Sequence, residues 1–263
     1  MEGYKVRWKY EEDKTSPIIS AKEHILSGHR SQEIVELPNR SVLFCIGIGL
    51  SYVEENYDTM ILMDSLPGFI THSKVLKIRG NENTCFVHGG YGSPAIADTI
   101  ETLHALGVNE IILVGMCGVF SNKADVGNII IPDRILSEEG TSRHYYSNVE
   151  FVEGHNDFEI NEIKTYFEEC SFKVITEDTV TTDALYRETY FKENIWRKKD
   201  CVGVDMEASA LISVCNYYNM KSIVLLLASD KHPNFENENT WAWVNEDFKN
   251  MQRNFIKSCA ELF

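Results

Sequence analysis

Short apolar segments alternate with longer amphipathic segments from residue 41 to the C-terminus. The short segments are continuously apolar rather than alternating, and we predict a strand for each: residues 42–46, 75–78, 85–87, 111–114, 129–131, 172–175 and 223–227. A strand that is apolar on both faces indicates a sheet that is covered on both sides.

Between these strands, apolar residues recur at helical spacing. They repeat every three or four positions from Ile96 to Leu106, and Gly107 follows as a C-terminal cap, which predicts a helix over residues 95–106. The other predicted helices span residues 159–169, 206–218 and 241–262. The alternation predicts an α/β fold in one domain, with a mixed, mainly parallel central sheet flanked by helices.

Residues 1–40 differ from the rest of the chain. They are polar and mixed in charge, apart from one amphipathic stretch at residues 19–26. We predict that they form an N-terminal arm laid on the main body, and that the compact domain spans residues 41–263. No internal repeat or Pro/Gly/Ser-rich linker divides that domain.

The charge balance limits the possible partners. Acidic residues outnumber basic ones by 40 to 25, which gives a formal net charge of −15, and no Lys/Arg cluster offsets this excess. We therefore expect neither nucleic acid nor an anionic membrane surface as a partner. The polar first residues and the lack of an apolar run near the roughly 18 residues of a membrane span favour a cytoplasmic protein.

The cysteines and histidines show no metal-ligand spacing. The seven cysteines lack CxxC pairs, and several lie in apolar segments, so we interpret them as reduced and mostly buried thiols: Cys45, Cys85, Cys117, Cys170, Cys201, Cys215 and Cys259. We expect no metal and no organic cofactor.

Ligands of open α/β sheets bind beyond the carboxyl ends of the strands, so the residues that follow each apolar segment are candidates. The segment 47–55 begins like a dinucleotide-binding loop, but Tyr52 stands at its third glycine position, and a plain tight turn is favoured. In the segment 88–94, Gly89 and Gly90 permit close approach to a ligand, and packing alone explains them equally well.

Cys117 follows the apolar segment 111–114. It would serve as a nucleophile only beside a basic group that lowers its pKa, and no such group is near in sequence, so a buried thiol is favoured.

Three carboxylic acids are further candidates, two at the start of a predicted helix and one at the end of a predicted strand. Asp205 and Glu207 begin the helix predicted over 206–218, where the helix dipole by itself favours acidic residues. Asp230 ends the most hydrophobic strand, where burial would raise its pKa enough for a general acid. The alternative is that Asp230 caps the turn at residues 231–234.

Taken together, these segments resemble the nucleoside phosphorylase superfamily, which includes purine nucleoside phosphorylases, uridine phosphorylases and methylthioadenosine-type nucleosidases. The resemblance covers roughly residues 42–263 and rests on five motifs in order: ILVGMCGVF (112–120), ADVGNIIIPDRILSEEGTSRHYY (124–146), TTDALYRET (181–189), VDMEASAL (204–211) and LLASD (226–230). EEGTSRHYY and TTDALYRET look most like uridine phosphorylases.

The resemblance implies roles for individual residues. Glu207, together with Met206, would hold the ribose hydroxyls and stabilise an oxocarbenium-like centre. Asp230 matches the acid that acts on purine N7, which uridine phosphorylases generally lack. The remaining substrate contacts would come from Gly89, Gly90, Cys117, Gly118, Val180, Thr181, Thr182, Asp205, Tyr186 and Arg187.

The phosphate site of the family is degenerate here. In the loop of Gly47, Ser51 stands where phosphorolytic relatives usually carry an arginine, Leu113 replaces a second arginine, and Met116 replaces a Ser or Thr ligand. Phosphate needs charge-assisted donors, so we expect water as the nucleophile, as in the nucleosidase branch. Inorganic phosphate bound in an unusual way stays open as a co-substrate. Glu54 or Glu55 stands about where nucleosidases carry the glutamate that activates water.

The sequence therefore predicts an enzyme that cleaves the N-ribosidic bond of a small-molecule nucleoside, with a slight preference for a purine. The alternatives are phosphorolysis of a pyrimidine nucleoside, as in uridine phosphorylases, and a non-catalytic nucleoside-binding protein. A thiol-dependent enzyme that uses Cys117 is the least favoured. Relatives in this superfamily imply a homo-oligomer, either a dimer or a hexamer.

Overall fold

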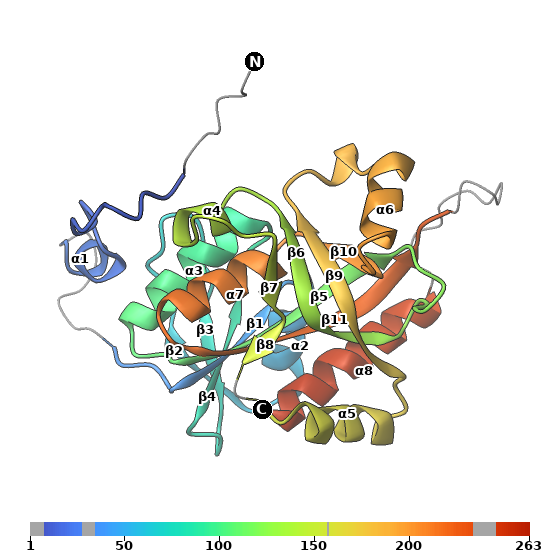
Figure 1. Cartoon of the computed structure of the whole chain (residues 1–263). Coiled ribbons are helices and arrows are strands. Elements are labelled where there is room, and N and C mark those ends of the chain that lie inside the picture. The colour runs from blue at the N-terminus through green and yellow to red at the C-terminus, as the bar shows by residue number, and fades with distance from the viewer. Residues whose placement is uncertain (1–7, 28–34, 157, 234–245) are drawn as a thin grey trace.

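The computed structural model describes residues 8–27, 35–156, 158–233 and 246–263. Figure 1 shows a central sheet with helices on both of its faces. The strands, in spatial order, are β2 (Thr59–Met63), β3 (Val75–Ile78), β4 (Thr84–His88), β1 (Arg40–Phe44), β5 (Glu110–Val119), β10 (Gly203–Asp205), β9 (Val174–Thr182), β6 (Ile129–Glu138), β11 (Lys221–Lys231) and β8 (His155–Asn156), and β7 (Phe151–Glu153) pairs with β6.

Five strands close into a ring. β5 pairs with β10, β10 with β9, β9 with β6 and β6 with β11, and β11 returns to pair with β5. The long ladders β1–β4, β1–β5, β5–β11 and β6–β9 are parallel, while β2, β3, β7 and β8 pair antiparallel. The predicted α/β fold with a mixed sheet flanked by helices is confirmed.

The helices are α1 (Ala21–Leu26), α2 (Gly49–Asn56), α3 (Ser93–Ala105), α4 (Ser142–Tyr145), α5 (Ile160–Glu169), α6 (Tyr190–Arg197), α7 (Ala208–Tyr217) and α8 (Glu246–Leu262), with a 3₁₀ turn, η1, at Leu185–Arg187. The predicted helices correspond to α3, α5, α7 and α8, although residues 241–245 of the last prediction lie outside the described residues.

Every predicted strand is present, and several are longer than the apolar segment that indicated them. β5, β6, β9 and β11 continue into polar or small residues because the closed ring supplies hydrogen-bond partners beyond the apolar part. The sequence pattern missed β2, β7, β8 and β10. β2 is only half-buried at the sheet edge, and the other three have two or three residues each.

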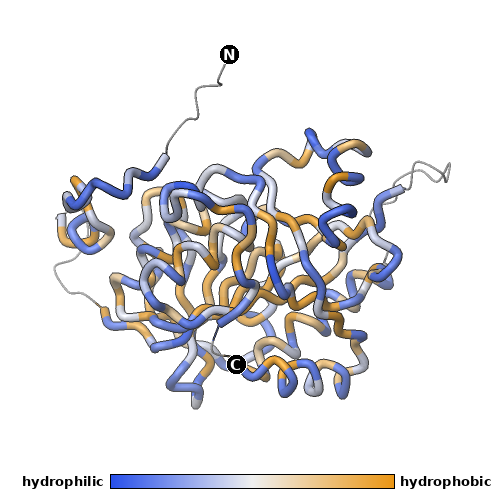
Figure 2. The backbone as a smooth tube through the Cα atoms, in the orientation of Figure 1, coloured by the Kyte–Doolittle hydropathy of each residue, from blue (hydrophilic) through white to orange (hydrophobic). Residues whose placement is uncertain are grey.

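The alternating side chains of the continuous apolar strands enter two separate cores. In β1, Leu43 faces α3 and α7, while Val42 and Phe44 face the opposite layer with α2, α5 and α8. In Figure 2 the strands of the central sheet are mainly orange, whereas the helices around them carry both orange and blue residues. A smaller third core forms where Trp196 of α6 packs on Phe120. The result is an α/β/α arrangement of three layers.

The described part of the arm contacts the main body at several points. The ring of Trp8 packs edge-on against His144, Lys9 donates to the carbonyl of Tyr145, and His24 of α1 stacks on Phe69 with 3.8 Å between ring centroids. α1 itself begins with a complete capping box at Ser20. Among the described residues, none of the helices has the length and hydrophobicity that a membrane crossing requires.

The aromatic packing of α8 gives a stability prediction. Phe255 is fully buried against Phe167 and Phe172, with ring centroids 5.9 and 6.1 Å away. Phe255→Ala should lower the free energy of unfolding by about 3–5 kcal/mol, because it leaves a cavity between the helix layer and the sheet. Urea denaturation followed by circular dichroism measures this. Lys257→Ala, an exposed change on the same helix, should stay within about 0.5 kcal/mol of wild type. Equal losses in both variants would contradict the assignment of this core.

Candidate active site

Four strands of the closed ring bring the candidate residues together at one end. Gly118 of β5 pairs with Val204 of β10 on one side and with Asp230 of β11 on the other. On the far side of β10, Asp205 pairs with Thr181 of β9. Segments that lie more than a hundred residues apart in sequence therefore meet around Gly118.

Asp205 organises the start of α7. Its Oδ2 accepts hydrogen bonds from the backbone N–H groups of Glu207 (2.8 Å) and Ala208 (2.6 Å), and its Oδ1 accepts from the Thr181 hydroxyl (2.6 Å). The Thr181 hydroxyl in turn accepts from the N–H of Ser209. These bonds fix the helix end and occupy both oxygens of Asp205, so its role in this structure is to position its neighbours.

Glu207 lies against the glycine-rich loop that begins α3. Its Oε1 accepts a 2.6 Å hydrogen bond from the N–H of Gly92, the residue that precedes the helix. Ser93 donates to the carbonyl of Met206 and ties the same two segments together. Gly92 has a φ of 84°, a conformation that glycine adopts without strain. The first free N–H group of α3 is thus directed at a carboxyl group of this chain.

The environment of this pair changes its acidity. Burial is the main reason that the pKa of Glu207 is raised, and the nearby charge of Asp205 raises it further. Burial also raises the pKa of Asp205, but the three hydrogen bonds that it accepts favour its charged form and limit the rise. Of the two, Glu207 is therefore the group that holds a proton more readily.

The glycines of this loop have close neighbours. A Cβ at Gly89 would lie 2.9 Å from Ile96 and 3.0 Å from the sulfur of Cys45, and one at Gly90 would lie 2.9 Å from Thr71. Packing therefore accounts for both glycines, and their proposed contact with substrate stays a prediction. A Cβ built at Gly47, in the loop after β1, would lie 3.4 Å from the oxygen of the Tyr91 hydroxyl.

A β-bulge directs Asp230. The register between β11 and β5 shifts at Ser229, so that Asp230 pairs with Gly118. The Ser229 hydroxyl lies 2.6 Å from Oδ1 of Asp230 and 3.2 Å from the carbonyl oxygen of Cys117. Bulges re-aim side chains in this way next to active sites. Asp230 is only 5% exposed, so its carboxyl group is buried and does not lie on the surface of the turn that follows.

His232 follows the same bulge and lies between two carboxyl groups. Its Nδ1 is 2.7 Å from Oε1 of Glu193 on α6, and its Nε2 is 3.4 Å from Oδ2 of Asp230. The ring occupies the space next to Gly118, where a Cβ would overlap Nε2. Arg197 binds the other oxygen of Glu193 at 3.1 Å. The charged network around Asp230 therefore extends through His232 to α6.

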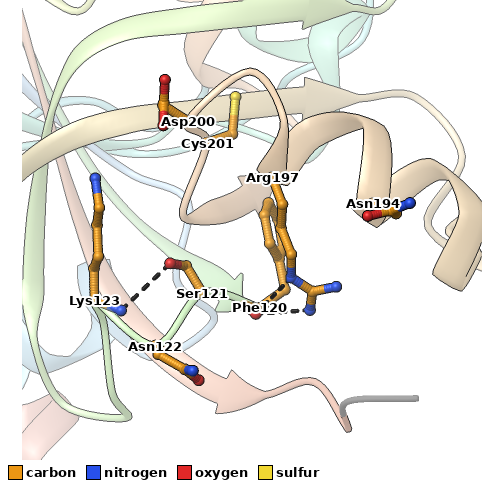
Figure 3. A pocket seen from close by; sticks show the side chains of 8 residues that line it. All are labelled: Phe120, Ser121, Asn122, Lys123, Asn194, Arg197, Asp200 and Cys201. Atoms are coloured by element: carbon orange, nitrogen blue, oxygen red, sulfur yellow. Dashed lines mark hydrogen bonds between the residues drawn. The ribbon is translucent and has the colours of Figure 1, made fainter. Parts of the chain in front are cut away.

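A cavity of about 360 Å³ lies on the outer side of this network. Its lining is polar: Phe120, Ser121, Asn122, Lys123, Asn194, Arg197, Asp200 and Cys201. Figure 3 shows the guanidinium of Arg197 bound to the carbonyl oxygen of Phe120, with donor–acceptor distances of 3.0 and 2.7 Å. Both hydrogen bonds anchor α6 to the end of β5. The cavity therefore borders this junction of α6 with β5 and is not lined by Glu207 or Asp230.

Cys117 is buried beside Asp205 and Asp230. Burial raises the pKa of its thiol well above the ordinary value, and both carboxylates raise it further. A protonated thiol is a poor nucleophile, so the environment of Cys117 argues against the thiol-dependent enzyme.

The positions of the degenerate phosphate site carry no cation. Leu113 is fully buried in the core, and Met116 contacts Gln252 of α8 through its sulfur. Ser51 lies on α2 and donates to the carbonyl of Ile48 within its own turn. These three side chains offer no charge-assisted donor to an anion.

Other sequence-predicted residues are not joined to this cluster by the contacts in the structure. Glu54 lies on α2, and its carboxylate forms an ion pair with Lys74 at 2.6 Å. Glu55 is exposed on the same helix, and Tyr186 of η1 is 89% exposed beside Arg187. Their roles in water activation and base binding stay predictions.

The sequence analysis missed three groups near the site, of which Glu139 and Glu193 are buried and His232 is partly buried. Glu193 and His232 form the network beside Asp230, and Glu139 accepts hydrogen bonds from Ser142 and Ser209 behind Asp205. His232 follows Asp230 by two positions, which was a usable signal, whereas Glu193 comes from a helix that the hydrophobic pattern did not identify. Within the described ranges, no three His, Cys, Asp or Glu side chains are arranged to hold a metal ion, and we assign no metal site.

Comparisons with known proteins agree with this fold. The chain superposes on purine nucleoside phosphorylase from Toxoplasma gondii, solved in complex with immucillin-H, with a TM-score of 0.70 and 16% identity over 86% of this chain and 92% of that one. Uridine phosphorylase from Vibrio fischeri gives a TM-score of 0.69 and 19% identity over 86% and 91% of the two chains. At these identities the likeness shows the fold alone.

Sequence comparison gives the family. The phosphorylase superfamily model matches residues 67–263, and the chain belongs to that superfamily. It is also similar to a guanosine phosphorylase from Halorubrum lacusprofundi, with 25% identity over 133 residues, or 51% of this chain and 55% of the relative. The chain thus spans just over half the length of this curated relative. The resemblance inferred from the five sequence motifs is confirmed.

The raised pKa of Glu207 predicts a pH-dependent stability. In the unfolded chain Glu207 ionises in the ordinary carboxyl range, whereas the folded protein holds the proton to higher pH, so stability is lost as the pH rises through that interval. Glu207→Gln should therefore raise the Tm by about 3–6 °C at about pH 9 and change it little at about pH 5. Differential scanning calorimetry at both pH values tests this. Glu150→Gln, which removes an exposed carboxylate, should show no gain at high pH. Equal melting temperatures of wild type and Glu207→Gln at high pH would contradict the prediction.

Proposed function

We propose that this protein cleaves the N-ribosidic bond of a nucleoside between two buried carboxyl groups, Glu207 and Asp230. The observation that carries the proposal is their arrangement around Gly118: Glu207 follows β10 on one side and Asp230 ends β11 on the other. Membership of the phosphorylase superfamily and the names of the relatives, which include guanosine phosphorylase, support the same reaction class.

The two carboxyl groups suit the two halves of the reaction. When the bond between C1′ and the base nitrogen breaks, positive charge develops on the sugar and negative charge on the base. Glu207, once ionised, accepts hydrogen bonds from ribose hydroxyls and stabilises the sugar cation. Asp230 faces the base and assists its departure by hydrogen bonding or protonation.

We favour a purine as the base, because a buried acid at position 230 can interact with the ring nitrogen that accepts a proton in a purine. The uridine-phosphorylase-like motifs leave a pyrimidine nucleoside as the alternative. A nucleoside-binding protein without turnover is the other alternative, and it is favoured only by the lack of cationic side chains at positions 51, 113 and 116.

Water is the favoured nucleophile. Asp205, Glu207 and Asp230 provide carboxyl groups but no cation, and a phosphate dianion needs charge-assisted donors. Ser51, Leu113 and Met116 provide none. Inorganic phosphate stays the alternative co-substrate.

We also propose a homo-oligomer. Phe69 and Ile70 are 66% and 56% exposed on a loop whose backbone N–H groups are held by Asp98. A rigid loop that presents large apolar side chains is suited to burial against another copy of the chain. Light scattering coupled to size-exclusion chromatography measures the assembly directly.

A turnover screen tests the reaction and the nucleophile together. Purine and pyrimidine nucleosides are incubated with and without inorganic phosphate, and mass spectrometry detects free base, ribose and ribose 1-phosphate. We expect free purine base and ribose without phosphate. Product that forms only with phosphate, as ribose 1-phosphate, would show that another part of the chain binds the anion. Nucleoside binding by calorimetry without any product would establish the binding protein instead.

Substitutions separate the two carboxyl groups. Asp230→Asn should lower kcat by about 10²–10⁴-fold because it removes the acid that faces the base. Glu207→Gln should lower kcat by about 10²–10³-fold because it removes the charge opposite the sugar cation. Glu150→Gln is the matched surface control and should keep wild-type rates. Full activity in both site variants would contradict the assignment.

Cys117→Ser distinguishes this reaction from a thiol-dependent one. Because the thiol is buried and its pKa is raised, the serine variant should keep kcat within about threefold of wild type, provided that circular dichroism shows a folded protein. Complete loss of turnover in the folded Cys117→Ser protein, with an active Asp230→Asn protein, would favour the thiol mechanism.

A further inference from the structure

The imidazole ring of His232 is held by acidic groups at both of its nitrogens. Nδ1 lies 2.7 Å from a carboxylate oxygen of Glu193, and Nε2 lies 3.4 Å from a carboxylate oxygen of Asp230. An ionised carboxylate only accepts hydrogen bonds, so a ring that serves both must carry a proton on each nitrogen. The side chain of His232 is largely buried, which protects this arrangement from water.

The backbone around His232 and the neighbouring helix α6 hold its imidazole ring in place. The N–H of His232 donates to the carbonyl of Val119 at 2.8 Å, and Gly118 leaves the room that the ring fills. On α6, Glu193 is nine-tenths buried and is held by Arg197, which in turn binds the carbonyl of Phe120. The distance between α6 and β11 is thus fixed independently of His232.

We propose that His232, held by Glu193, is a positioning residue that stores the proton used by Asp230. The inference rests on the proposed function and deepens it by naming the source of that proton. Neither residue needs to touch the substrate, because each acts through Asp230.

The proton balance is complete with water as the co-reactant. The bond between C1′ and the base nitrogen breaks, and its electron pair stays on the base. Nε2 of His232 gives its proton to the ionised Asp230, and Asp230 passes a proton to another ring nitrogen of the base. Water forms the new bond to C1′ and releases a proton, which returns the ring to its charged form.

Among the described residues, three carboxyl groups near the imidazole ring favour its charged form, and Arg197 opposes it. Asp230 lies on β11, Glu193 on α6 and Glu188 just before α6, where burial raises the pKa of Glu188 to about 7. Arg197 opposes them but is bound to Glu193. Burial alone would lower the pKa of His232, and the hydrogen bonds and charges of Asp230 and Glu193 outweigh it and raise this pKa to about 9.

Nuclear magnetic resonance tests whether His232 holds this proton, and the test does not depend on turnover. The full chain is labelled with ¹³C at histidine Cε1 and titrated with base, and His232→Gln identifies the resonance. We expect a midpoint near the pKa of about 9. In Glu193→Gln the midpoint should fall by at least about one pH unit, because one of the two carboxylates that hold the proton is gone.

Glu150→Gln removes a carboxylate from an exposed ion pair with Lys199 and should leave the His232 midpoint unchanged. A wild-type midpoint at the ordinary histidine value of about 6.5 overturns the proposal. A Glu193→Gln midpoint equal to that of wild type overturns it as well.

Kinetics then test whether the stored proton is used. The alkaline limb of kcat/KM should follow the His232 midpoint, move to lower pH in Glu193→Gln and disappear in His232→Gln, while Glu150→Gln keeps the wild-type profile. Turnover with the same alkaline limb in all variants overturns the role of His232 but keeps the proposed function. Absence of turnover in every protein, with the His232 titration as expected, overturns the proposed function instead.

Discussion

The pairing of β11 with β5 is the constraint on which the rest of the site depends. Through it the ring of five strands closes, so the ends of β5, β9, β10 and β11 lie side by side instead of spreading along an open sheet. The bulge at Ser229 then places Asp230 beside Gly118. Glu207, which follows β10, and Asp230 of β11 are thereby brought to the same end of the ring.

The closed ring also explains how so many acidic groups remain buried. Asp205 and Glu139 accept hydrogen bonds from backbone groups or hydroxyls, and Glu193 is compensated by Arg197 and His232. Burying a carboxyl group without such partners would cost several kcal/mol. Burial raises the pKa of both Glu207 and Asp205. The rise is larger for Glu207 because the charge of Asp205 adds to it and fewer hydrogen bonds oppose it. The hydrogen bonds of Asp205 and Glu139 thus stabilise the segments around Glu207.

The confirmed and the open parts of the sequence predictions differ for a physical reason. Continuous apolar strands and one clear helical repeat indicated the layers, because burial on two faces leaves a strong local pattern. The edge strand β2 and the short β10 leave little pattern, so both were missed. Likewise Glu207 stood out at the start of a predicted helix and Asp230 at the end of a predicted strand, while Glu193, on the unidentified α6, did not.

The sequence by itself determined the fold class, the family and the strand ends that carry acidic residues, because these depend on local hydrophobicity and on motifs of a few residues. Only the tertiary structure decided which of those ends meet. It placed Glu207 on the N–H of Gly92 and His232 between Asp230 and Glu193, and it paired Glu54 with Lys74. Apart from the contact of His232 with Asp230, these contacts join residues 20 to 115 positions apart, and the packing of distant segments sets them rather than any local preference.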